Sequence, residues 1–128
     1  MENRRIILGM TGASGAILGI RLLEALQRAD IETHLVMSEW AEKTVAMETE
    51  YTAEDVKALA SVVHTPRDMA ACISSGSFPT DGMVVCPCSM KTLAAIASGF
   101  SYNLIARCAD VSLKEGRRLI LIPRETPL

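Results

Sequence analysis

Four short segments of this chain are apolar along almost their whole length, and longer segments with helical spacing separate them. A strand that is apolar on both faces is typical of a parallel sheet covered by helices on both sides, whereas a half-exposed strand alternates. The pattern therefore predicts an α/β protein with three layers. The expected strands are residues 4–10, 32–37, 83–88 and 117–123.

Helices are expected between these strands from their capping residues and apolar spacing. Ser38, Thr52 and Ser89 each precede a helical segment and are good N-cap residues, while Gly99 and Gly116 are suited to ending one. The stretch from 61 to 82 has no clear period and is left unassigned. The expected helices are residues 14–29, 38–50, a short one after Thr52, 89–99 and 103–116.

Length and charge narrow the class of protein further. The chain has 128 residues, 49% of them hydrophobic, which suits one domain over residues 1–128. A formal net charge of −2 lacks the basic character of a nucleic-acid-binding protein. No apolar run is long enough to cross a bilayer, and the N-terminus does not resemble a signal peptide, so we expect a cytoplasmic protein without membrane contact.

The cysteines do not have the spacing of a metal site. Cys86 and Cys88 flank a proline as C-P-C, which is neither a zinc nor a redox spacing, and His34 and His64 lie far away in sequence. We therefore expect no metal, and we expect reduced thiols that pack as small buried side chains. The same holds for the other two cysteines, Cys72 and Cys108.

A glycine-rich stretch, "GMTGASGAILG", follows the first expected strand. It is not a dinucleotide fingerprint, because Met10 stands where G-x-G-x-x-G needs glycine and the second strand ends in Met37 and Ser38 rather than an acid. It is not a P-loop either, since no lysine follows. The glycines could serve only a tight turn. Small hydroxylated residues after several strands nevertheless favour a phosphate-bearing ligand at the carboxyl edge of the sheet.

Five blocks together resemble the UbiX-type flavin prenyltransferases, formerly described as the small subunit of aromatic acid decarboxylases. These blocks are "GMTGASGAILGIRLLEAL", "ETHLVMS", "ISSGSF", "CPCSMKTL" and "ADVSLKEGRRLILIPRETPL". The resemblance implies a flavodoxin-like, Rossmann-like doubly wound parallel sheet that forms a homo-oligomer. It also implies transfer of a dimethylallyl group from dimethylallyl phosphate to reduced FMN, giving prenylated FMN for a UbiD-type decarboxylase.

The resemblance also assigns flavin-binding residues. The glycine loop matches the family's flavin-binding turn, and Ser14 is placed close to the reacting flavin, where the family makes it catalytic. For Ser14 and Ser38 the residues alone equally allow an ordinary helix N-cap. The implied cofactor-binding residues are Gly12, Ala13, Ser14, Ser38, Ser89, Thr92 and Arg124.

Charged residues complete the implied site. Glu48 and Glu125 match catalytic acid–base groups, although Glu48 by pattern alone would be a solvated helix residue. Arg107, Lys114 and Arg124 match the side chains that bind the substrate phosphate. Cationic side chains suit this task because charge-assisted hydrogen bonds to phosphate oxygens are strong and help the leaving group depart.

Members of this family run further at the C-terminus than this chain, which ends just after "PRETP". We therefore expect a C-terminally shortened flavoprotein domain that lacks part of the donor site. Two alternatives remain open on the sequence: an FMN-binding module without transferase activity, or a subunit associated with a decarboxylase.

Overall fold

The computed structural model describes residues 4–125, which fold around one five-stranded sheet. All neighbouring strands are parallel, and their order is β3-β2-β1-β4-β5. The chain therefore builds one half of the sheet outward from β1 and then returns to build the other half. The strands are β1 (Arg5–Met10), β2 (Glu32–Met37), β3 (Val62–His64), β4 (Gly82–Cys88) and β5 (Arg118–Pro123).

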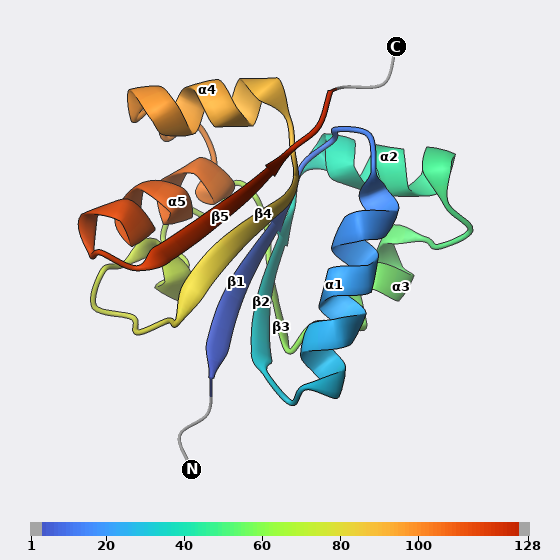
Figure 1. The fold of residues 1–128 in the computed structure, drawn as a ribbon, viewed down its shortest axis with the longest axis horizontal. Coiled ribbons are helices and arrows are strands. Elements are labelled where there is room, and N and C mark those ends of the chain that lie inside the picture. The colour runs from blue at the N-terminus through green and yellow to red at the C-terminus, as the bar shows by residue number, and fades with distance from the viewer. Residues whose placement is uncertain (1–3, 126–128) are drawn as a thin grey trace.

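Helices cover both faces of the sheet, as Figure 1 shows, with α1, α2 and α3 on one side and α4 and α5 on the other. This confirms the predicted α/β class with three layers. The prediction of one domain over residues 1–128 reaches beyond the described residues at both ends. The helices are α1 (Ala16–Arg28), α2 (Glu39–Glu48), α3 (Ala53–Lys57), α4 (Met90–Ser98) and α5 (Leu104–Lys114), with a 3₁₀ turn, η1 (Cys72–Ser74).

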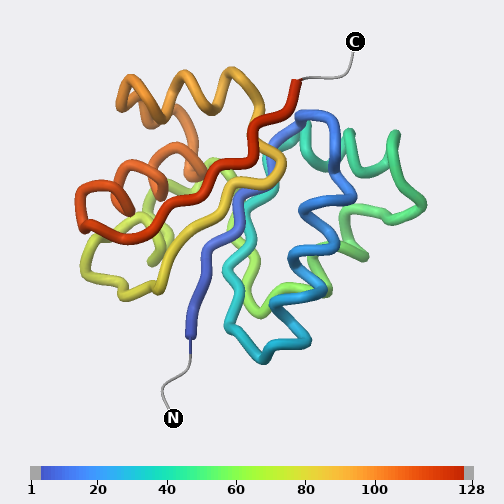
Figure 2. Tube along the Cα trace, in the orientation of Figure 1, coloured from blue at the N-terminus to red at the C-terminus, as the bar shows by residue number. Residues whose placement is uncertain are grey.

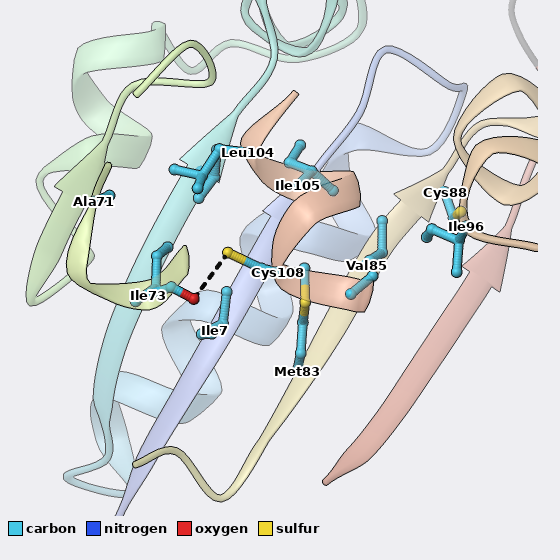
Figure 3. Close-up of a cluster of buried hydrophobic side chains, with 12 residues drawn as sticks. Ile7, Ala71, Ile73, Met83, Val85, Cys88, Ile96, Leu104, Ile105 and Cys108 are labelled. Carbon is cyan, nitrogen blue, oxygen red and sulfur yellow. Dashed lines mark hydrogen bonds between the residues drawn. The ribbon is translucent and has the colours of Figure 1, made fainter. Parts of the chain in front are cut away.

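Two hydrophobic cores lie back to back across the sheet. Successive side chains of a strand point to opposite faces, so Ile7 packs with α5 and η1 while Leu8 packs with α1. Figure 3 shows the first core, in which Ile73 of η1 lies against Leu104 and Cys108 of α5. Burial of both strand faces explains why β1, β2 and β4 are continuously apolar. The edge strand β5 is only partly covered, although its sequence is just as apolar.

The structure differs from two local predictions, the start of the first helix and the burial of Cys72, and it shows what the unassigned stretch forms. The predicted helix over residues 14–29 begins only at Ala16, because Gly15 adopts a left-handed conformation with φ 96° that the helix cannot include. In the unassigned stretch, β3 is an edge strand of three residues, too short for a periodic signal. Of the four cysteines predicted to be buried, Cys72 is exposed, whereas Cys86, Cys88 and Cys108 are buried.

Candidate functional site

A cleft of about 780 Å³ opens at the carboxyl edge of the sheet. It lies where the strand order reverses between β1 and β4, which is the usual ligand position in doubly wound sheets. Its volume is in the range of small-molecule and cofactor sites. The cleft is lined by Thr11, Gly12, Ser38, Glu39, Trp40, Pro66, Arg67, Met69, Ser89, Lys91, Thr92, Tyr102 and Asn103.

Three helices begin at this cleft, each with a polar N-cap. Ser38 accepts a hydrogen bond from Ala41 N (3.0 Å) at the start of α2, and Ser89 accepts one from Thr92 N (3.2 Å) at the start of α4. Asn103 caps α5 in the same way. The remaining first-turn N–H groups and the positive ends of three helix dipoles thus surround one space, an arrangement that favours an anionic ligand.

A network of hydroxyl groups fixes the wall of the cleft beside α4. Ser89 Oγ donates to Thr92 Oγ1 (3.0 Å), and Thr92 Oγ1 lies 3.0 Å from the Tyr102 hydroxyl. The Lys91 ammonium lies over that aromatic ring, 4.8 Å from its centroid. The predicted residues Ser89 and Thr92 are therefore held in place before any ligand arrives.

Thr11 is a cleft residue that sequence reasoning missed. Its hydroxyl donates to Pro87 O (2.7 Å) and accepts from Ser89 N (2.9 Å), so it joins the end of β1 to the start of α4. The side chain is buried, which makes both bonds costly to lose. Its position directly after a strand and before the glycines was the available signal.

Gly12 lines the cleft, but the neighbouring helix also requires a glycine there. A Cβ on Gly12 would lie only 2.4 Å from Trp40 Cβ, and Trp40 is fixed in the first turn of α2. Ala13, the next predicted residue, is fully buried behind the cleft wall. The glycine loop is therefore shaped at least partly by the packing of protein against protein.

Glu48 lies at the other side of the glycine loop, outside the cleft lining. Its Oε1 accepts hydrogen bonds from the backbone N–H groups of Gly15 (3.0 Å) and Ala16 (3.1 Å). The carboxylate at the C-terminal end of α2 thus caps the N-terminus of α1. Ser14 does not perform this task, because Gly15 is the N-cap and no side-chain cap bond is formed there.

The segment after β5 pairs with the glycine loop. Ser14 N donates to Glu125 O (2.9 Å), and Arg124 N donates to Cys88 O (2.9 Å). Arg124 Nη1 lies 3.2 Å from the position that a Cβ on Gly15 would take. Figure 2 shows the turns after β1 and β4 meeting the end of β5 at one edge of the sheet. Ser14, Glu48, Arg124 and Glu125 therefore form one group, here called the glycine-loop group, beside the cleft.

The two remaining predicted cations lie elsewhere. Arg107 is half-buried in α5, and its Nε donates to Ser74 O (3.3 Å) of η1. Lys114 ends α5, pairs with Asp110 (3.0 Å) and precedes β5, so it lies at the opposite edge of the sheet from the cleft. Neither residue lines the cleft of this chain.

The histidines are close together in the structure, although they are thirty residues apart in sequence. His34 Nδ1 lies 2.9 Å from His64 Nε2, and the two rings are stacked. The register explains this contact, because Val36 of β2 pairs with His64 of β3, which places His34 and His64 on one face. The sequence argument compared these histidines only with Cys86 and Cys88 and did not anticipate the contact between them.

Fold and cleft together define a doubly wound α/β protein with a polar ligand site at its topological switch point. The flavoprotein family model, described as "Flavoprotein", matches residues 1–126. The chain is 61% identical over 125 residues to a probable UbiX-like flavin prenyltransferase of Escherichia coli O157:H7. The chain belongs to the Flavoprotein family and, within it, to the UbiX-like flavin prenyltransferases.

Solved structures agree with this assignment. The crystal structure of AnUbiX (PadA1) in complex with FMN and dimethylallyl pyrophosphate matches 99% of this chain and 68% of its own, with a TM-score of 0.96 and 63% identity. A dodecameric FMN-dependent UbiX-like decarboxylase from Escherichia coli O157:H7 matches 97% of this chain and 68% of its own, with a TM-score of 0.93 and 61% identity. The flavodoxin-like fold is thereby confirmed.

The match with the Escherichia coli relative spans 97% of this chain but only 64% of the relative's length. Within residues 4–125, no helix is long and apolar enough to cross a membrane.

Proposed function

We propose that this chain binds FMN in the cleft and is a flavin prenyltransferase that moves a dimethylallyl group from dimethylallyl phosphate to reduced FMN. The observation that carries this proposal is the agreement with AnUbiX, whose crystal structure contains FMN and dimethylallyl pyrophosphate, at a TM-score of 0.96. A cleft of cofactor size at the carboxyl edge of the sheet, where three helices begin, supports it.

The residues of the cleft fit a flavin mononucleotide. Its phosphate needs several donors, and the N-termini of α2 and α4 supply backbone N–H groups together with the hydroxyls of Ser38 and Ser89. Its ring system needs a flat apolar contact, and Trp40, which is 63% exposed, presents one at the same cleft. Gly12 and Thr92 would complete the wall around it, with Ala13 packed behind them.

The glycine-loop group is suited to the transfer step. Reduced FMN supplies the electron-rich N5 and C6 atoms to which the dimethylallyl group becomes attached. The Arg124 guanidinium would bind the phosphate as the allylic C–O bond breaks, with the electron pair leaving on the phosphate oxygen. Glu48, Glu125 and the Ser14 hydroxyl would move protons near the flavin. The roles assigned to Arg107 and Lys114 stay predictions, since neither lines the cleft.

Assembly and partners belong to the same proposal. Large apolar side chains, among them Trp40, Met47 and Phe100, are each more than 60% exposed, which is typical of a surface that associates. One solved relative is dodecameric. We propose a homo-oligomer, which sedimentation at micromolar concentration would test. A UbiD-type decarboxylase as recipient of the product and a cytoplasmic location stay predictions.

The activity is tested by anaerobic incubation of the purified chain with FMN, dithionite and either dimethylallyl phosphate or dimethylallyl pyrophosphate. Extracted flavin is then analysed by mass for one added five-carbon unit. A mass gain supports the transferase, and the better donor identifies the leaving group. Bound FMN without a mass gain would indicate a flavin-binding module, and failure to bind FMN would contradict the whole proposal.

The proton-transfer role is tested by Glu48→Gln, which keeps an oxygen acceptor for the Gly15 and Ala16 N–H groups but removes the proton-exchanging group. We expect FMN to stay bound and conversion to slow by about 10²–10⁴-fold. Unchanged conversion in this variant would remove Glu48 from the chemistry.

A further inference from the structure

Three side chains with metal-binding atoms meet away from the cleft, on the face of the sheet that η1 covers. His34 comes from β2, His64 ends β3, and Cys72 begins η1. One ligand atom of each residue lies within 4.8 Å of the others, and no other such group of three is found among residues 4–125. Two imidazoles and a thiol from three different elements are thus brought to one point.

His34 is oriented as a metal ligand would be. Its Nε2 lies 2.8 Å from Glu32 Oε2, and that carboxylate is also paired with Arg5. An Nε2–H donated to Glu32 leaves the lone pair of Nδ1 facing His64. A carboxylate behind a histidine is the usual outer partner of a metal-bound imidazole, because it fixes the tautomer and raises the basicity of the ligand.

The His34 ring is also held in place by its neighbours. Phe78 packs edge-on against the His34 ring at 5.4 Å between centroids, which restricts its rotation. Two imidazoles held next to each other thus present ring nitrogens to one point.

Cys72 is the thiol that is able to complete the set. It is exposed, so a metal can reach its sulfur from solution. Cys108 is the nearest rival, but its thiol donates to Ile73 O (3.4 Å), as Figure 3 shows. Burial raises the pKa of Cys108 to about 12, which keeps it a thiol. The two cysteines therefore differ in the property that metal binding requires.

We propose that His34, His64 and Cys72 form a zinc site with water as the fourth ligand. The mixed N₂S donor set is one that Zn²⁺ accepts, and one negative thiolate with Glu32 close by balances the ion's charge. Zinc bonds of about 2.0–2.3 Å need the two nitrogens to separate from 2.9 Å to about 3.3 Å and the sulfur to move inward. Side-chain rotation at exposed Cys72 allows this closure. Zinc would then replace the His34–His64 hydrogen bond.

This zinc site is connected to the wall of the cleft, although the proposal of metal binding does not depend on the proposed function. Residues 65–71 connect two of the ligands, and Pro66, Arg67 and Met69 within that segment line the cleft. Zinc bound to His64 and Cys72 would hold both ends of the segment against the β2–β3 edge.

Metal binding is tested on the purified full chain, first stripped with chelator, by titration with Zn²⁺ and with Co²⁺ as a spectroscopic probe. We expect one equivalent of either metal and a thiolate-to-cobalt charge-transfer band. Zn²⁺ should also protect Cys72 from alkylation by iodoacetamide, which peptide mass analysis would locate. These readouts need neither FMN nor turnover.

Four variants test the ligands, the rival thiol and the outer partner. Cys72→Ser should abolish the cobalt–thiolate band and His64→Gln should abolish stoichiometric binding, whereas Cys108→Ala should leave both unchanged. Glu32→Gln should weaken the affinity by about 10–100-fold, as expected for an outer partner. Thermal melting would confirm that each variant is folded. The absence of a stoichiometric Zn²⁺ complex, or one that survives in Cys72→Ser and His64→Gln alike, would overturn the proposal.

Discussion

The cleft and the glycine-loop group lie side by side but are built in different ways. In the cleft, Ser38 and Ser89 are helix caps, whose positions follow from a few neighbouring residues. In the glycine-loop group, Glu48 reaches Gly15 across thirty-three positions, and Arg124 reaches the same glycine from the far end of the described chain. The first region depends on local chemistry and the second on the completed tertiary fold.

This difference implies that substitutions should separate the two regions. A change at a cap can alter ligand binding while the fold persists, provided that the new residue still caps. A change in the glycine-loop group alters contacts between distant segments, so stability and function should respond together. The four predictions below use this separation. Each has a measurement that could show that the two regions respond to substitution in the same way.

The largest effect is expected from Ser38→Asp. Aspartate caps a helix about as well as serine, but its charge would stand where we place the flavin phosphate. FMN affinity should fall about 100-fold or more, corresponding to about 2.8 kcal/mol, while the melting temperature changes little. Ser38→Asn is the matched neutral cap and should retain most of the affinity. Equal losses in both variants, measured by flavin titration, would contradict a phosphate at this helix.

A smaller effect is expected from Gly12→Ala. The added Cβ would lie 2.4 Å from Trp40 Cβ, so the start of α2 must shift. We expect the free energy of unfolding to fall by about 1–3 kcal/mol in denaturant titrations without flavin. Gly99→Ala offers a control with open space around its Cβ, although its positive φ gives a strain of its own. Unchanged stability of Gly12→Ala without flavin would mean that packing does not require this glycine and that only the ligand does.

Glu48→Ala should lower stability by about 1 kcal/mol, because the two N–H groups at the start of α1 lose their acceptor. Glu48→Gln keeps an acceptor and should lower it less. The comparison of the two variants by thermal and chemical unfolding separates the capping role of Glu48 from any proton transfer. Equal stability of all three proteins would mean that the cap does not contribute.

The smallest effect on the cleft is expected from Lys114→Ala. Lys114 pairs with Asp110 on an exposed helix end at the far edge of the sheet, so FMN affinity should change less than about twofold. Arg124→Ala, which changes a residue beside the glycine loop, is the contrasting variant. It should weaken binding of the substrate phosphate more than Lys114→Ala does. A strong loss of FMN in Lys114→Ala would show that the site extends beyond the cleft of one chain.

The sequence predicted the fold and the caps well because both depend on short-range rules. The apolar runs correspond to β1, β2, β4 and β5, and the predicted N-caps Ser38, Thr52 and Ser89 all accept the expected backbone bond. The edge strand β3 was missed because three residues at the margin of a sheet carry no periodicity.

The parts of the site that the sequence could not place depend on contacts between distant segments. Nothing near Glu48 indicates that its carboxylate caps α1. The edge that Lys114 occupies could have been predicted, since it lies between a predicted helix and the strand that follows it. The His34–His64 contact arises from the register of β2 and β3, which the sequence leaves open. Thr11 could have been singled out, since it directly follows a buried strand.

The carboxylate of Glu48 also limits what kind of nucleotide this protein can accept. In many doubly wound proteins the first helix after the glycine loop receives a pyrophosphate. Here that helix end already holds an anion that is tethered to the chain and therefore present at a high effective concentration. A dinucleotide would have to displace this internal competitor, whereas a mononucleotide can use the neighbouring helix ends. The capped end of α1 thus favours a ligand with one phosphate over a ligand with two.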